Sequence, residues 1–159
     1  MRINFSDMPP IKDDNSIFLA GPTLRNASFQ ESWRKEACNM LESLGFNGTV
    51  YVPEFSVGNN PPNFLEQAWW ERECLLNAGC IVFYVNRKFP ENPGMTTNVE
   101  FGMYLAKRPK CVFLCTPDGY DKNRYLDWLY DTEMKENNID RKVYKTMRDV
   151  LEAAVEFIK

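Results

Sequence analysis

Apolar and polar positions form blocks along this chain that predict strands and helices in turn. Short, nearly continuous apolar runs predict buried strands at residues 16–20, 49–52, 80–85 and 110–115, with a short edge strand at 142–145. Between them, apolar residues recur every three or four positions, which predicts helices from a cap at Asn26 or Ser28 to Leu44 and over 64–78, 97–107, 123–136 and 146–158. Strands that alternate with helices in this way predict right-handed crossovers and a parallel sheet.

The run at residues 80–85 is apolar almost throughout, which is typical of a strand buried on both faces of a sheet. We therefore predict an α/β fold with a mostly parallel sheet of about five strands and helices on both faces. The length of 159 residues is that of one domain. We expect a single domain over 1–159, with residues 1–15 as an N-terminal extension.

Composition and charge indicate which kinds of partner and which cellular compartment to expect. A formal charge of −3 does not indicate a nucleic acid polymer or a membrane surface as partner. Five cysteines without a C-x-x-C pair predict buried free thiols in a reducing compartment. No apolar stretch approaches the roughly 18 residues that span a bilayer, and the first ten residues lack a signal-peptide apolar region. We expect a cytoplasmic protein.

The residue types also limit the chemistry. The chain has no histidine and no cysteine cluster, and its acidic residues lack calcium-loop spacing, so we expect no metal site. Neither G-x-G-x-x-G nor a P-loop is present, and we expect no cofactor. Acid, base or nucleophile work therefore falls to carboxylates.

Residues 93–102 set the carboxylate of Glu100 at the start of a predicted helix, just after a buried strand, among Thr96, Thr97 and Asn98. This is where α/β proteins carry their ligands. A helix N-terminus favours the ionised carboxylate, which is the form that attacks a sugar carbon. The alternative is structural, because Thr97-x-x-Glu100 is also a capping box.

The loop after the first predicted strand is a second candidate site. Loops after the first and third strands flank the crevice of a doubly wound sheet, so we expect them to converge. The glycine allows close backbone approach, and the polar side chains offer donors to a sugar or phosphate; the alternative is a plain tight turn. The candidate residues of this loop are Gly21, Pro22, Thr23, Arg25 and Asn26.

Three further side chains are candidates. Glu71, in the helix before the third core strand, supplies a second carboxylate near Glu100; the alternative is an ordinary helix pair with Leu75. Arg87 and Asn123 follow the third and fourth strands, where a cation and an amide suit phosphate recognition. The alternative for both is solvated surface.

Several segments together resemble a known family. They are Ile17-Phe-Leu-Ala-Gly-Pro22, Ser32-Trp-Arg34, Gly48-Thr-Val50 with Val52-Pro-Glu54, Gln67 with Trp70-Glu71, Asn123-Arg-Tyr-Leu-Asp-Trp128 and, most specific, Pro93-Gly-Met-Thr-Thr-Asn-Val-Glu-Phe-Gly102. They resemble the nucleoside 2-deoxyribosyltransferase-like family, in particular its less characterised second branch. The resemblance extends from about residue 16 to 155.

The resemblance implies a flavodoxin-like sheet of order 2-1-3-4-5 and an N-glycosidic bond as the target. A glutamate at the position of Glu100 attacks the anomeric carbon of a small nucleoside or nucleotide and expels the base, and a second base or water then takes the sugar. Glu71 is the supporting carboxylate. The resemblance also implies a homo-oligomer, since members borrow residues from a neighbouring subunit.

The chain departs from the family at two positions. Phe18 stands where members carry an aromatic hydroxyl on the first strand, and Arg72 aligns with their base-contacting aspartate. Two alternatives to transfer therefore stay open. One is a nucleoside 5′-monophosphate N-glycoside hydrolase, and the other is a non-catalytic nucleotide-binding module on the same fold.

Overall fold

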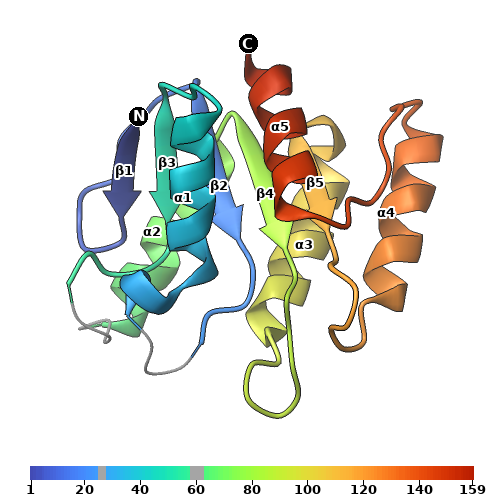
Figure 1. Cartoon of the computed structure of the whole chain (residues 1–159), viewed down its shortest axis with the longest axis horizontal. Coiled ribbons are helices and arrows are strands. Elements are labelled where there is room, and N and C mark those ends of the chain that lie inside the picture. The colour runs from blue at the N-terminus through green and yellow to red at the C-terminus, as the bar shows by residue number, and fades with distance from the viewer. Residues whose placement is uncertain (25–27, 58–62) are drawn as a thin grey trace.

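A five-stranded, all-parallel sheet forms the centre of the protein, in a computed structural model that describes residues 1–24, 28–57 and 63–159 (Figure 1). The strands lie in the order β1-β3-β2-β4-β5. Their bounds are Arg2–Phe5 (β1), Ser16–Ala20 (β2), Thr49–Val52 (β3), Cys80–Tyr84 (β4) and Val112–Cys115 (β5). Every residue of β2, β3 and β5 is buried, which confirms the predicted parallel α/β class.

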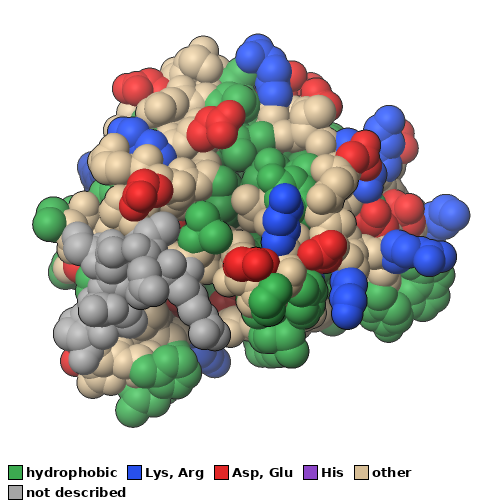
Figure 2. Space-filling view, turned by 60° about the horizontal axis from the view of Figure 1, so that its bottom comes forward, with side chains coloured by type: hydrophobic (Ala, Val, Ile, Leu, Met, Phe, Trp, Pro, Cys, Tyr) green, Lys and Arg blue, Asp and Glu red, His purple; other side chains and the backbone are tan. Residues whose placement is uncertain are grey.

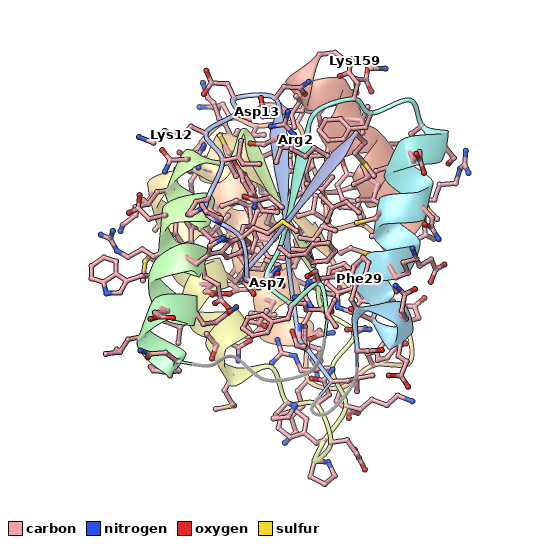
Figure 3. All side chains as sticks on the ribbon, turned by 90° about the vertical axis from the view of Figure 1, so that its left-hand side faces the viewer. Arg2, Asp7, Lys12, Asp13, Phe29 and Lys159 are labelled. Atoms are coloured by element: carbon pink, nitrogen blue, oxygen red, sulfur yellow. The ribbon has the colours of Figure 1, made fainter. Side chains whose placement is uncertain are left out.

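Helices cover both faces of this sheet. Their bounds are Trp33–Ser43 (α1), Phe64–Asn77 (α2), Met95–Lys107 (α3), Arg124–Glu136 (α4) and Met147–Ile158 (α5), with short 3₁₀ turns at Phe29–Glu31 and Pro109–Cys111. One apolar core lies between the sheet and α1 with α5, and a second lies between the sheet and α2, α3 and α4. Viewed from the β1 side, α1 and α2 flank the sheet on opposite sides (Figure 3). No helix among the described residues is long and apolar enough to cross a bilayer.

The edges of the sheet differ from the predicted order 2-1-3-4-5. The four strands from β3 to β5 follow that order, but residues 2–5 of the expected extension add β1 beside β3. The side chain of the buried Asn4 bonds to the backbone of Pro9 and Ile11, which closes the turn after β1. The predicted strand at 142–145 is reduced to one bridge between Tyr144 and Cys115. It stops there because Thr146 caps α5 at once.

The start of α3 also differs from the prediction. The helix begins at Met95 rather than Thr97, after Gly94 in a left-handed conformation with φ of 60°. Glu100 therefore lies more than one turn inside the helix. The capping box predicted for Thr97 and Glu100 is wrong, since the cap of α3 is Gly94.

All five cysteines are free thiols, four of them buried and Cys111 partly exposed. This agrees with the expectation from their number and spacing.

The packing of Gly79 yields a stability prediction. A Cβ on Gly79, between α2 and β4, would lie 2.2 Å from the carbonyl oxygen of Asp14 and 3.0 Å from that of Ser16. We expect Gly79→Ala to lower the free energy of unfolding by about 1–3 kcal/mol, because the backbone must shift. Urea denaturation measures the change.

The matched control is Gly102→Ala in α3, where a Cβ meets no described atom within 4 Å and the substitution stabilises the helix by up to about 1 kcal/mol. An equal effect of both substitutions would contradict the packing at Gly79.

Candidate active site

A cavity of about 550 Å³ opens at the carboxyl end of the sheet, on the face covered by α2 and α3. We call it the Glu100 cavity. Its walls come from the end of β2 and the loop that follows, from α2, and from the start of α3 with the segment before it. The lining includes Phe18, Gly21, Pro22, Thr23, Arg34, Gln67, Glu71, Arg72, Thr96, Thr97, Glu100 and Tyr104.

Glu100 and Glu71 face each other in this cavity from α3 and α2. The pKa of Glu100 is raised from 4.5 to about 8, mainly by burial and then by the charge of Glu71 and a hydrogen bond with Glu71, while Arg34 acts in the opposite direction. Gln67, one turn before Glu71, donates from Nε2 to Oε1 of Glu71 at 2.6 Å and so fixes its position. The direction of this shift favours a proton on the Glu100–Glu71 pair, unlike the ionised carboxylate expected at a helix start.

The loop after β2 is held by the side chain of Arg34, which is only 1% exposed. Its guanidinium donates to the carbonyl oxygen of Leu19 at 2.8 Å, to that of Gly21 at 2.7 Å and to Oγ1 of Thr23 at 2.9 Å. Nη1 also pairs with Oε1 of Glu54 at 2.6 Å. Arg34 thus fixes the wall formed by residues 21–23.

The loops after β2 and β4 converge as predicted. Gly21 has a φ of 149°, and a Cβ there would lie 2.3 Å from the carbonyl oxygen of Tyr84 at the end of β4. At the start of α3, a Cβ on Gly94 would lie 2.6 Å from Cγ of Pro22. These close approaches bring the loop after β2 against both β4 and α3, with Thr23 in the wall between.

Besides Glu71 and Glu100, five predicted site residues from the loop after β2 and from α3 line the cavity, namely Gly21, Pro22, Thr23, Thr96 and Thr97. Arg25 and Asn26 lie outside the described residues.

Arg87, Asn98 and Asn123 are not among the described residues that line the Glu100 cavity. Arg87 is 2% exposed, and its Nη2 donates to Oδ1 of Asn98 at 2.6 Å, behind the loop before α3. Its burial lowers the pKa of the guanidinium. Asn98 lies two positions before Glu100, on another side of the helix. Asn123 lies at the start of α4, and its Nδ2 donates to the carbonyl oxygen of Val85. In this structure these side chains brace loops, and the substrate contacts predicted for the three residues stay a prediction.

Several residues that shape the cavity were not among the predicted site residues. Arg34 and Glu54 entered only as parts of a family motif, although an arginine among the apolar positions of a helix signals a buried ion pair. Tyr104, one turn after Glu100, brings a phenol to a cavity whose floor carries Phe18. Spacing along α3 was the signal for Tyr104, since positions four apart share a helix face.

Figure 2 looks onto this end of the sheet and shows acidic and basic side chains around apolar ones. Among residues 1–24, 28–57 and 63–159, no three histidine, cysteine, aspartate or glutamate side chains gather as metal ligands would.

The raised pKa of Glu100 predicts a pH-dependent stability. The unfolded chain loses this proton near pH 4.5 and the folded protein near pH 8, so stability falls as pH rises between these values. We expect Glu100→Gln to be more stable than the native protein at pH 8, by at least about 1 kcal/mol, and equal to it below pH 4.5. Urea denaturation across this range measures the difference. Glu66→Gln, exposed on α2, controls for the loss of one carboxylate, and a constant difference at all pH values would contradict the burial of Glu100.

Comparison with known families agrees with this architecture. A family model described as nucleoside 2-deoxyribosyltransferase like matches residues 14–119. A comparison with curated proteins gave no match. The matched segment covers more than half of the 159 residues, runs from β2 to β5, and contains both Glu71 and Glu100. The chain therefore belongs to the nucleoside 2-deoxyribosyltransferase-like family.

Proposed function

We propose that this protein cleaves or exchanges the N-glycosidic bond of a deoxynucleoside or nucleotide, with Glu100 as nucleophile and Glu71 as its partner. The observation that carries the proposal is the pair of carboxyl groups in one cavity at the carboxyl end of the sheet. Two carboxyl groups that flank a glycosidic bond are the usual equipment for its hydrolysis or transfer.

The raised pKa of Glu100 adds a proton source to this pair. Expulsion of a base requires a proton on the base, and attack on C1′ requires a carboxylate. A pair that holds one proton supplies both. Oxygen of Glu100 bonds to C1′, the bond from C1′ to the base nitrogen breaks, and the shared proton leaves through Glu71 to the base. Glu71 ends as the carboxylate, beside a glycosyl ester of Glu100.

The second half of the reaction reverses these steps. Water or another base loses a proton to Glu71 and attacks C1′, and the ester bond to Glu100 breaks. Water as acceptor gives hydrolysis, and a base gives transfer. The configuration at C1′ is retained, because two displacements occur.

The first test is base release and exchange on a panel of deoxynucleosides and their 5′-monophosphates. We expect Glu100→Gln to lose activity by at least roughly 10³-fold, because the covalent step needs the carboxylate, and Glu71→Gln to lose about 10²–10⁴-fold. Mass spectrometry of the denatured native protein should find a deoxyribosyl adduct that maps to Glu100.

Glu66→Gln is the matched control, since it lies on α2 with Glu71 but does not line the cavity. Undiminished activity in Glu100→Gln would refute the proposal. Ligand-induced thermal stabilisation without turnover on the whole panel would favour the non-catalytic binding module, and a preference for monophosphates with water as acceptor would favour the hydrolase.

We also propose that the protein assembles as a homo-oligomer through α2 and α3. Large apolar side chains are exposed on both helices, namely Phe64, Leu65, Trp69, Met95, Val99 and Met103. Three of them, Phe64, Met95 and Met103, also line the Glu100 cavity. A second copy on this face would shield both the apolar surface and the mouth of the cavity from water.

Sedimentation equilibrium tests the assembly. We expect Val99→Glu to shift the native oligomer to monomer, because Val99 is 64% exposed on α3 and a charge there opposes apolar contact. Ser43→Glu on α1, on the other face of the sheet, should leave the mass unchanged. A monomeric native protein, or a Val99→Glu protein of native mass, would rule out this interface.

A further inference from the structure

A second cavity, of about 680 Å³, lies at the same end of the sheet on the opposite face, beside α1. We call it the α1-side cavity. Its walls come from α1 and the 3₁₀ turn before it, from the end of β4 and the loop that follows, and from Tyr120 and the first residue of α5. The proposed reaction uses no residue that belongs to this cavity alone.

The walls of the α1-side cavity combine aromatic rings with side-chain amides. The rings of Trp33 and Tyr84 lie 5.0 Å apart and form one side, and Tyr120 contributes a third ring. Asn39 and Asn86 bring amides, and Oδ1 of Asn86 is buried without a hydrogen-bond partner among the described residues. Aromatic faces stack on planar rings, and amides both donate and accept at ring edges. This chemistry suits a planar nitrogen heterocycle.

The charges on these walls favour a neutral ligand. Lys35 and Lys88 are the described cations, and Glu31, Glu36 and Glu91 are carboxylates that outnumber them. Glu54 also faces the cavity, but Arg34 already neutralises it. Figure 2 shows both acidic and basic side chains on this end of the molecule. A phosphate would meet carboxylates as well as cations, so a free base fits better than a nucleotide.

The α1-side cavity shares a wall with the Glu100 cavity. Thr23, Glu91 and Asn92 line both. Oγ1 of Thr23 accepts a hydrogen bond from Arg34, which fixes this common wall in place. A ligand on the α1 side therefore sits next to the site where the proposed reaction releases a base.

We propose that the α1-side cavity is a separate binding site for a free nucleobase. The choice of a nucleobase rests on the proposed function, since the base is the leaving group of that reaction. The site itself rests on its aromatic and amide walls, its size and the absence of a net positive charge on its described walls. A cavity of this volume is large enough for a small heterocyclic ligand.

Equilibrium dialysis with free adenine and free thymine tests the proposal on three variants that each add one large side chain at an exposed position. Asn39→Trp fills the α1-side cavity, Ala68→Trp fills the Glu100 cavity, and Ser43→Trp on α1 touches neither. We expect base binding to persist in Ala68→Trp and Ser43→Trp, within about twofold of the native dissociation constant for this site. Asn39→Trp should weaken it at least about tenfold. Circular dichroism checks that each variant is folded.

Two results would overturn the second site. One is the loss of all base binding in Ala68→Trp, and the other is unchanged binding to this site in Asn39→Trp. Because dialysis needs no turnover, the outcome does not depend on whether Glu100 is a nucleophile. If the native protein consumes nucleosides but the dialysis test fails, only the second site is refuted. If the dialysis test succeeds but Glu100→Gln stays active, only the proposed mechanism is refuted.

Discussion

The buried ion pair between Arg34 and Glu54 is the interaction on which the functional end of this protein depends. The guanidinium of Arg34 has almost no contact with water. Glu54 therefore has to neutralise its charge, and nearby oxygens have to accept its hydrogen bonds. Two of those oxygens are backbone carbonyls at the end of β2 and in the loop that follows, and a third is the hydroxyl of Thr23. A single side chain from α1 thereby sets the wall shared by two cavities.

The position of Glu100 shows how the fold raises the pKa of a carboxyl group at a cost in stability. A carboxyl group inside a partly apolar cavity, next to a second carboxylate, is less favourable when charged than it is in water. The protein keeps this arrangement although a glutamine would avoid the charge. Such a conflict between stability and local chemistry is typical of active sites. In the reaction that we propose, the same burial lets the pair hold the proton that the leaving base requires.

Each face of the sheet has a cavity at the carboxyl end of the strands. Parallel strands direct all their carboxyl ends to the same edge, and the strand order reverses between β2 and β4, so the helices that follow these two strands, α1 and α3, lie on opposite faces. The Glu100 cavity lies on the α2 and α3 face at this edge, and the α1-side cavity lies on the other face. The two cavities lie close together because all strands of the sheet are parallel. Their walls differ because different helices supply the side chains.

The sequence by itself determined the α/β class, because periodicity and strand burial are local properties of the chain. Its resemblance to the family implied the order of the four strands from β3 to β5 and offered Glu71 as the neighbour of Glu100. The sequence did not determine β1, whose four residues gain their pairing only from β3. The raised pKa of Glu100 and the loop-bracing contacts of Arg87, Asn98 and Asn123 also came only from the tertiary structure. Burial, the distance between charges and the direction of a side chain depend on segments that lie far apart in the chain, so they cannot be obtained from local patterns.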